Sequence, residues 1–451
     1  MKEPVVMLQE MLDSLLDGKK YSTLRDILVT LNGADIAALF QELPEGRLPL
    51  LFRLLPKELA AETFVEMEPE EQELLIRGFS DSELKEVIDE LYLDDAVDIV
   101  EEMPANVVKR ILENADPDTR KKINEILKYP EDSAGSMMTI EYVRLRRQFT
   151  VEEAIKHIRR TGIDKETVYT CYVTDDAHTL LGVVSVRSLL TSDEDTPIED
   201  IMETNVIYVH TLEDKENVAN LFQKYDFIAL PVVDDEQRLV GIVTVDDAID
   251  VLQEEFTEDI EKMAAIMPSD KPYIKTSVFA LWKARIPWLL LLMISATFTG
   301  TIITSFENAL ASQVVLAAFI PMLMDTGGNC GSQSSVTVIR GLSLGEIEFS
   351  DLLSVQWKEI RVAFLCGLTL AAANFAKLMW INHLPINLAL VVCSTLLITV
   401  VCAKIVGCTL PILSMKIGFD PAVMSSPFIT TIVDAISLFL YFKIATAMLP
   451  I

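Results

Sequence analysis

Five long apolar runs in residues 276–451 constrain the fold of this chain more than any other feature. They cover residues 286–306, 309–324, 362–376, 384–403 and 421–442. An α-helix rises about 1.5 Å per residue, so runs of this size suit the roughly 30 Å hydrocarbon core of a bilayer. Tryptophan, which membrane interfaces favour, lies near the run ends at Trp282, Trp288, Trp357 and Trp380. We therefore expect residues 276–451 to form an α-helical transmembrane domain with five spans.

The fifth run contains one ionisable side chain, that of Asp434, close to its midpoint. A carboxylate there costs about 2.5–3.5 kcal/mol on insertion scales unless it faces water, a cation or a polar partner. Two interpretations follow: a protonated carboxyl group bonded to a neighbouring helix, or a cation ligand in a permeation path. We favour the second, which predicts that the chain moves cations across a membrane.

The second run continues into a stretch of glycine and small polar residues, PMLMDTGGNCGSQSSVTVIRGL, between Pro321 and Leu342. Glycine at membrane depth allows helices to pack closely, or allows a break whose backbone carbonyls line a cavity. Close packing alone explains the glycines but not Asp325 and Asn329 beside them. Directly after the fourth run, Lys404 is interpreted as a side chain that snorkels toward the membrane interface.

Charge is divided unevenly along the chain. Residues 1–270 hold 27 Lys and Arg against 60 Asp and Glu, whereas residues 271–451 hold 11 against 8. Such an acidic surface repels phosphates, so nucleic acid is not an expected partner, whereas divalent cations are; scattered acidity also simply aids solubility. The N-terminus lacks the pattern of a secretory signal. Lys and Arg gather in the loop between residues 340 and 361, which predicts a cytosolic N-terminal half.

Residues 1–130 are expected to form an all-α domain of short helices stacked into a superhelix. Prolines at the starts of these helices are typical of first helical positions. In the segment YLDDAVDIV, Asp94 and Asp98 are four residues apart and share one helix face. Like charges at this spacing are unfavourable alone, which indicates a bound cation or a basic partner, unless water suffices to screen them.

Residues 131–250 contain an internal repeat in which strand-like and helical runs alternate. LLGVVSVRSLL at 180–190 matches LVGIVTVDDAI at 239–249, and Gly182 corresponds to Gly241. This repeated β-α-β-β-α unit resembles a tandem pair of CBS domains. That resemblance implies a regulatory α/β module and allows ATP or another adenine nucleotide to bind between the repeats.

An acidic helix is expected to leave the second repeat and to connect it to the membrane domain over residues 251–275. Together with the residues just before it, this segment carries eight carboxylates in sixteen residues: Asp246, Asp247, Asp250, Glu254, Glu255, Glu258, Asp259 and Glu261. A plain linker is one interpretation. Regulation by metal is the other, because a helix this acidic repels itself unless cations neutralise it.

With these parts in this order, the whole chain resembles the MgtE family of bacterial magnesium channels and transporters. The most specific matches are GGNCGSQSS in the second span and FDPAVMSSPFITTIVDAISL through the fifth. The sequence contains no Walker A, kinase or GxSxG motif, so an enzyme is not expected. The resemblance implies a homodimer in the bacterial plasma membrane that transports Mg²⁺.

The resemblance also assigns a pore. It makes Asp434 the central selectivity site between the second and fifth spans of both subunits, where the carboxylates hold hydrated Mg²⁺ through its water molecules. The implied pore lining adds Asp325, Gly328, Asn329, Ser332 and Ser426. The two serines stand where relatives often have Asn, which bears on selectivity for Mg²⁺ against Co²⁺ or Mn²⁺.

The acidic helix resembles the plug helix of the family, which closes the pore when cytosolic Mg²⁺ is high. The carboxylates implied to bind regulatory Mg²⁺ are Asp94, Asp98, Asp214, Glu216, Asp226, Asp247, Asp250, Glu255, Glu258, Asp259 and Asp420. Without metal their like charges push the domains apart, and with metal the domains are drawn together. Such sites are expected to bind weakly, because they sense millimolar-range Mg²⁺.

Other functions remain open to the sequence. A coupled carrier that exchanges Mg²⁺ or Co²⁺ against H⁺ or Na⁺ is the main alternative, because Asp325 and Asp434 are both able to serve such coupling. An anion channel with regulatory repeats is a further class. The lone carboxylate in the fifth run and the lack of basic pore residues argue against it.

Overall fold

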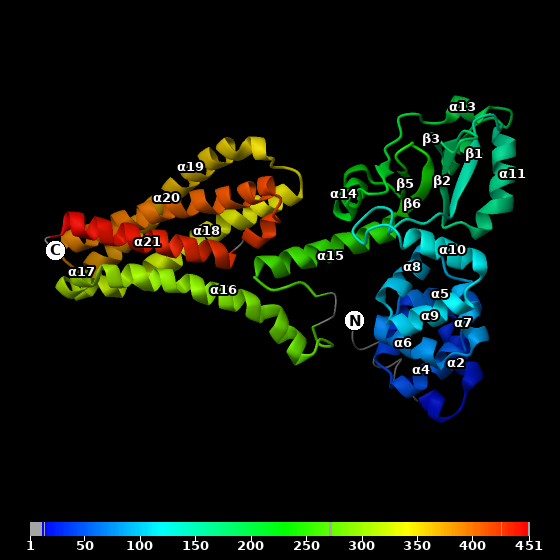
Figure 1. Ribbon diagram of the computed structural model, residues 1–451, viewed down its shortest axis with the longest axis horizontal. Coiled ribbons are helices and arrows are strands. Elements are labelled where there is room, and N and C mark those ends of the chain that lie inside the picture. The colour runs from blue at the N-terminus through cyan, green and yellow to red at the C-terminus, as the bar shows by residue number, and fades with distance from the viewer. Residues whose placement is uncertain (1–10, 13, 270–272, 425, 450–451) are drawn as a thin grey trace. The chain divides into compact units, whose positions relative to one another are not determined.

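The computed structural model describes residues 11–12, 14–269, 273–424 and 426–449. The chain forms two compact units, Met1–Leu252 and Gln253–Ile451 (Figure 1). Helix α15 (Val245–Met263) crosses the boundary between them. It is the acidic connecting helix expected from the sequence, although it begins earlier than residue 251 and ends well before residue 275.

The first part of the N-terminal unit is built from short helices. They are α2 (Tyr21–Leu28), α3 (Gly33–Gln41), α4 (Leu48–Phe52), α5 (Lys57–Val65), α6 (Pro69–Gly78), α7 (Asp81–Ile88), α8 (Leu93–Glu102), α9 (Ala105–Asn114) and α10 (Pro117–Ile126). Alternate helices pack against each other, α3 on α5, α5 on α7 and α7 on α9. This stacking gives the superhelix predicted from the sequence, around a core that includes Leu24, Phe40 and Leu75.

Local chemistry fixes where these helices begin. Pro69 and Pro117 occupy the first helical turn as predicted, whereas Pro56 and Pro104 stand one residue earlier, at the N-cap. Proline suits both positions because neither requires its missing N–H group. At α7, Ser80 and the third helical residue, Glu83, satisfy each other's backbone N–H groups in a capping box.

Two three-stranded sheets follow, each with its own helices. The first repeat contains β1 (Tyr142–Arg146), α11 (Val151–Thr161), β2 (Thr167–Thr174), β3 (Leu180–Ser185) and α12 (Val186–Thr191). The second contains α13 (Ile198–Ile201), β4 (Val209–His210), α14 (Lys215–Tyr225), β5 (Ala229–Val233) and β6 (Leu239–Thr244). In both sheets the first strand pairs parallel to the second, and the second pairs antiparallel to the third. The internal repeat is thereby confirmed in three dimensions.

The matching glycines of the repeats have the same structural cause. A Cβ atom at Gly182 would lie 2.8 Å from the carbonyl oxygen of Glu203, and one at Gly241 would lie 2.8 Å from that of Thr139. In each repeat a backbone segment crosses beside the third strand at this point, with bridges Val183–Glu203 and Thr139–Ile242. A side chain would block the crossing, so both strands carry glycine there.

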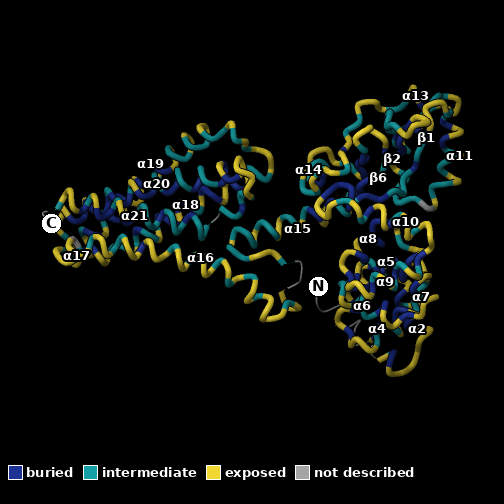
Figure 2. The backbone as a smooth tube through the Cα atoms, viewed as in Figure 1, coloured by how far each residue is buried: buried dark blue, intermediate teal, exposed yellow. Residues whose placement is uncertain are grey.

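Among the described residues of the C-terminal unit, five helical segments are long and apolar enough to cross a membrane. They are Val278–Ser305, Val314–Ser343, Phe349–Trp380, Ile386–Ile417 and Pro421–Met448, and their main helices are α16 (Val278–Ser305), α18 (Ile320–Ser343), α19 (Leu352–Trp380), α20 (Ile386–Ile417) and α21 (Ser426–Met448). The number of spans is as predicted. The second begins later than residue 309, because that region forms the short helix α17 (Glu307–Ser312). Helix α20 is the most buried of the five (Figure 2).

Helix α18 is continuous through its glycine-rich stretch, so close packing rather than a break accounts for the glycines. A Cβ atom at Gly327 would come within 2.9 Å of Thr399 on α20, and one at Gly331 within 2.8 Å of Ile429 on α21. A Cβ atom at Gly407 would overlap the carbonyl oxygen of Gly331. Helix α18 therefore lies against α20 and α21 along a smooth face of small residues.

Candidate functional site

Helix α18 carries a polar stripe on the face away from Gly327 and Gly331. Asp325, Asn329 and Gln333 recur at four-residue spacing and are all exposed in the single chain. Three polar side chains in a row are costly against lipid, because bilayer lipid offers them no hydrogen-bond partners. This stripe therefore needs water, an ion or another protein surface beside it.

Asp434 lies on α21 and is half-buried. Its Oδ1 atom is buried and has no hydrogen-bond partner among the described residues. The carboxylate of Asp325 is near enough to interact with it electrostatically. The first interpretation of Asp434 was a protonated carboxyl group bonded to a neighbouring helix. Among the described residues, Oδ1 makes no such hydrogen bond.

The other predicted pore-lining residues lie where α18 meets α21. Ser332 and Ser426 are hydrogen-bonded to each other through their hydroxyl groups, with an Oγ–Oγ distance of 2.8 Å. A Cβ atom at Gly328 would lie 2.8 Å from the side chain of Thr430, so this glycine packs α18 onto α21. The structure therefore places Gly328, Ser332 and Ser426 between α18 and α21, whereas Asp325 and Asn329 lie on the exposed face of α18.

Lys404 corrects the sequence analysis. Its side chain does not snorkel, because the residue is only 4 % exposed. The ammonium lies 3.1 Å from the hydroxyl oxygen of Ser334 on α18 and 3.5 Å from a carboxylate oxygen of Glu359 on α19. The sequence did not reveal this contact, since Glu359 stands 45 residues away from Lys404 and a hydrophobicity pattern treats each residue separately.

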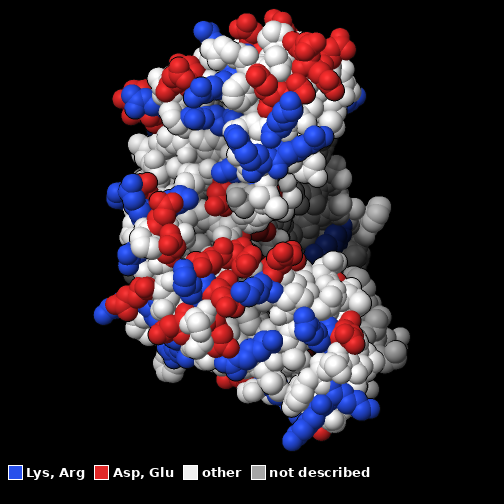
Figure 3. Space-filling model, turned by 90° about the vertical axis from the view of Figure 1, so that its right-hand side faces the viewer, with Lys and Arg blue, Asp and Glu red and all other residues white. Residues whose placement is uncertain are grey.

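The N-terminal unit holds a second candidate site, here named the acidic cluster. It consists of carboxylates that act on one another electrostatically: Asp94, Asp95, Asp98, Glu141, Glu166, Asp246 and Asp247. They come from α8, from the segments before β1 and β2, and from the first turn of α15. Figure 3 shows groups of Asp and Glu side chains interspersed with Lys and Arg on one face.

Burial and mutual repulsion raise the pKa values of the carboxyl groups in this cluster. Burial raises the pKa of Asp94 well above its usual range, and the charges of Asp247 and Asp95 raise it further. Loss of hydration, followed by the charges of Asp247 and Asp95, raises the pKa of Asp98 to about 8. Burial raises the pKa of Asp247 to about 7, although Thr244 donates a hydrogen bond to it at 2.5 Å. Each of these carboxylates is less stable as an anion than in water.

Part of this cluster, including Glu141 and Glu166, was not predicted from the sequence. Burial and the charges of Asp95, Asp246 and Asp247 raise the pKa of Glu166 to about 8, and the Oε2 atom of Glu166 has no hydrogen-bond partner among the described residues. Glu166 and Glu141 belong to connecting segments, so no helical spacing links them to α8. Asp95 and Asp246 were visible as neighbours of predicted residues but were not assigned.

Other predicted regulatory carboxylates lie outside the acidic cluster, and two of them make local contacts. Asp214 caps the start of α14 by accepting from the N–H of Glu216 at 3.0 Å. Asp226 ends the same helix in a left-handed conformation with φ of 55°. Asp250 is exposed on α15. Across the part of the chain that the structure describes, no group of three or more His, Cys, Asp or Glu side chains is close enough to hold a metal ion.

In the C-terminal unit, the end of α15 meets the segment before α21. Lys262 lies 2.7 Å from a carboxylate oxygen of Glu258 and 2.6 Å from one of Asp420. Burial would lower the pKa of Lys262, but its hydrogen bonds to Asp420 and Glu258 raise it overall. Asp259 accepts from Ser343 at 3.4 Å, and Glu255 is half-buried on the same helix. An ammonium group thus lies between two of the predicted metal ligands.

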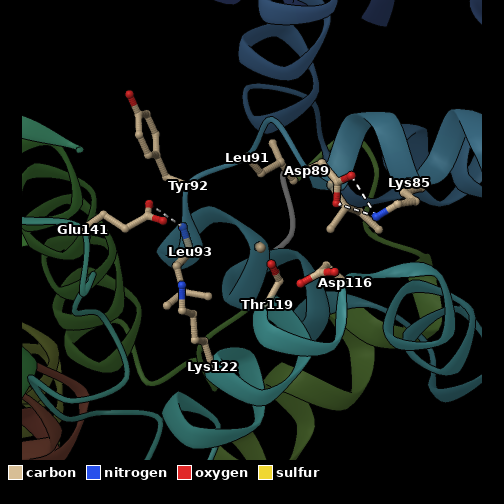
Figure 4. A pocket seen from close by; sticks show the side chains of 11 residues that line it. Lys85, Asp89, Leu91, Tyr92, Leu93, Asp116, Thr119, Lys122 and Glu141 are labelled. Carbon is tan, nitrogen blue, oxygen red and sulfur yellow. Dashed lines mark hydrogen bonds and ion pairs between the residues drawn. The ribbon is translucent and has the colours of Figure 1, made fainter. Parts of the chain in front are cut away.

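A cavity of about 330 Å³ lies between α7, α8 and α10, and Glu141 lines one side of it (Figure 4). There Glu141 accepts a hydrogen bond from the backbone N–H of Leu93 at 3.4 Å. On another side Lys85 pairs with Asp89 at 2.9 Å. Since the lining carries charges of both signs, the cavity lacks the concentrated negative charge of the acidic cluster.

Comparison with known protein families accounts for most of the chain. Residues 31–132 match the MgtE intracellular N domain, and residues 134–195 and 198–254 each match the CBS domain. Residues 320–444 match the MgtE family of divalent cation transporters.

Individual relatives support the same family assignment. The chain is 40 % identical over 430 residues to the magnesium transporter MgtE of Thermus thermophilus, covering 94 % of this chain and 95 % of the relative. It is 34 % identical to that of Bacillus subtilis, covering 96 % and 95 %. Among solved structures, the cytosolic domain of the Mg²⁺ channel MgtE in complex with ATP matches with a TM-score of 0.52 and 40 % identity, covering 54 % of this chain and 99 % of that one. The soluble part of a magnesium transporter matches with a TM-score of 0.52 and 31 % identity, covering 56 % and 99 %.

Proposed function

The chain belongs to the MgtE family of magnesium transporters, and we propose that it is a Mg²⁺ channel whose path runs along α18 and α21 of two paired copies. One observation carries this proposal. The polar stripe of α18 is exposed in the single chain, and the Asp434 carboxylate has a buried oxygen without a hydrogen-bond partner among the described residues. Both features are costly in a membrane unless ions and water occupy the space beside them.

A second copy of the chain would enclose this path. Symmetric dimers are the commonest assemblies, and a two-fold axis beside α21 would bring two Asp434 carboxylates together. Mg²⁺ gives up its water shell reluctantly, so the two carboxylates would hold the hydrated ion mainly through water. Asp325, Asn329, Ser332 and Ser426 would then supply further oxygen atoms, and Gly328 would keep α18 close to α21.

Cytosolic Mg²⁺ would close this channel through the acidic cluster. Its raised carboxylate pKa values mean that the folded protein holds repelling groups close together. Divalent cations would relieve the repulsion and favour the compact arrangement, provided that they bind it more tightly than the alternative. Asp94, Asp98 and Asp247 are the proposed principal ligands.

The remaining predicted carboxylates would contribute less directly. Along α15, Glu255, Glu258 and Asp259 would share cations with Asp420, where Lys262 now balances part of their charge. Asp214, Asp226 and Asp250 would act as outer, exposed ligands, together with the half-buried Glu216. The CBS pair would bind ATP or another adenine nucleotide, as the related cytosolic domain does. The protein would lie in a bacterial plasma membrane with the N-terminus in the cytosol.

Flux of Mg²⁺ into proteoliposomes tests the path. Asp434→Asn, which keeps the side-chain volume and removes the charge, should lower flux by at least about tenfold. Glu346→Gln is the matched control, because Glu346 is an exposed carboxylate in the loop after α18 and should leave flux unchanged. Normal flux through Asp434→Asn would mean that the path lies elsewhere.

The same vesicles test gating and coupling. Flux through the unaltered chain should fall as internal Mg²⁺ rises, whereas Asp94→Asn combined with Asp247→Asn should need more Mg²⁺ for the same closure. Imposed pH or Na⁺ gradients should not drive Mg²⁺ uptake through a channel. Uptake against a Mg²⁺ gradient under those conditions would establish the coupled carrier instead.

A further inference from the structure

Helix α20 carries a lysine deep inside the protein. Lys404 stands in a helix whose other residues between Ile386 and Met415 are uncharged. Lysines in spanning helices usually extend along lipid toward the interface, but this one is 4 % exposed and its helix is the most buried of the five. A buried charge in this position is costly unless an opposite charge and well-aligned hydrogen bonds compensate it.

Three helices supply that geometry. The Lys404 ammonium donates to the Ser334 hydroxyl at 3.1 Å and lies 3.5 Å from the Glu359 carboxylate. The same hydroxyl donates to that carboxylate at 2.6 Å. Lys404, Ser334 and Glu359, here named the buried triad, therefore form a closed, charge-balanced triangle between α18, α19 and α20.

The buried triad lies beside the part of α18 that packs on α20 through glycine. Val338 of α18 packs with Cys408 and Ile412 of α20, but around Gly331 the face that α18 presents is made of glycine and other small residues, and Gly331 and Gly407 approach each other backbone to backbone. A smooth face of this kind packs closely but has few protruding side chains that would stop rotation or sliding. Directional hydrogen bonds at Ser334, one turn beyond Gly331, add to the nearby Ser332–Ser426 contact and favour one rotation of α18 here.

Ser334 is also placed to control the polar stripe. With about 100° between successive residues of an α-helix, Asp325 lies about 180° and Asn329 about 140° around α18 from Ser334. A rotation of α18 about its axis that displaces Ser334 therefore turns Asp325 and Asn329 through the same angle and changes how they face the path.

We propose that Lys404 is a positioning residue that, through Ser334 and Glu359, fixes the rotation and depth of α18 and thereby sets how well the channel distinguishes Mg²⁺ from other divalent cations. This proposal rests on the proposed function for the location of the path. Lys404 touches no transported ion. Its effect reaches Asn329 and Asp325 only through the helix that carries them.

The test compares variants that disturb the buried triad in different ways. Ser334→Ala removes the bridging hydroxyl and keeps both charges, whereas Lys404→Met leaves Glu359 unpaired. Lys404→Met combined with Glu359→Gln removes both charges, and it should fold better than Lys404→Met alone. Lys404→Arg keeps the charge and the donors and serves as the conservative control.

Two measurements are made on each variant in proteoliposomes. The first is the ratio of Mg²⁺ flux to Co²⁺ flux, which is independent of the amount of active protein. The second places Asn329→Cys in each background and follows its reaction with a membrane-impermeant thiol reagent by tandem mass spectrometry. Neighbouring Cys330 is buried, so the modified site can be assigned.

We expect Ser334→Ala and the double variant to change both the flux ratio and the labelling rate by about fivefold or more, and Lys404→Arg to preserve both. If Ser334→Ala and the double variant keep the original flux ratio and labelling rate, the buried triad only adds stability and the proposal is wrong. Normal flux through Asp434→Asn would overturn the proposed path separately, while labelling at position 329 would still report whether α18 had moved.

Discussion

At the scale of single residues, charge crowding distinguishes the acidic cluster from the carboxylates at the end of α15. The acidic cluster combines carboxylates from three parts of the N-terminal unit, and burial together with their mutual repulsion raises their pKa values to about 6 for Asp95 and about 8 for Glu166. In the C-terminal unit, by contrast, Lys262 compensates Glu258 and Asp420 directly. A divalent cation would therefore bind more favourably at the acidic cluster than at the end of α15.

The raised pKa values predict a dependence of stability on pH in the absence of metal. In the unfolded chain these carboxyl groups release their protons near pH 4, whereas in the folded protein several keep them until about pH 6–8. The folded state thus binds more protons in this window, so its stability should fall as pH rises from about 4 to about 8. Thermal unfolding of the fragment 1–252 in chelator should show this fall, and Mg²⁺ should reduce it. An unfolding midpoint that rises with pH would contradict the prediction.

Removing one negative charge should have the same sign of effect. Asp247→Asn keeps an oxygen that accepts from Thr244 but ends the repulsion with Asp246 and Asp95. We expect the metal-free fragment to gain on the order of 1 kcal/mol in free energy of unfolding, and its stabilisation by Mg²⁺ to shrink. Asp235→Asn, at an exposed loop carboxylate, is the control that should change neither quantity.

At the scale of elements, the packing of α18 on α20 depends on glycine. Gly407→Ala would press a methyl group into the carbonyl oxygen of Gly331 and should destabilise the membrane domain by roughly 1–3 kcal/mol. Gly300→Ala on α16 is a matched control, because a Cβ atom there meets no atom within 4 Å. Thermal unfolding in detergent should separate the two variants, and equal midpoints would mean that the α18–α20 contact yields more easily than the structure indicates.

Elements with a clear period were predicted well from the sequence. In the internal repeat, where strand-like and helical runs were expected to alternate, the structure has β2 and α11, because alternation and helical spacing are local properties. The β-α-β-β-α unit implies a strand before α11, but the residues of β1 were not identified because YVRLR mixes apolar residues with arginine. Of the acidic cluster, Asp94, Asp98 and Asp247 were found, but Glu141 and Glu166 join it only through tertiary contacts. The partner of Lys404 was hidden for the same reason.

At the scale of the whole molecule, the proposed path needs two copies of the chain. The five spans include one helix, α16, that is largely exposed in the single chain, while the polar stripe of α18 is exposed as well. Lipid can cover the apolar surface of α16 but not the stripe. A dimer that encloses the stripe around water and ions, and leaves α16 facing lipid, gives each surface a suitable environment.

Mixed dimers distinguish one shared path from two independent ones. If unaltered chains and Asp434→Asn chains are refolded or co-expressed in equal amounts and pair at random, about half of the dimers contain one of each. Independent paths would leave total flux at about half of the unaltered value, because every unaltered chain still conducts. A shared path that needs both carboxylates would leave only the dimers of two unaltered chains, and flux should fall to about one quarter. Because two carboxylates facing one hydrated ion act together, we expect the lower value, with separately reconstituted and then fused vesicles as the unmixed control at one half.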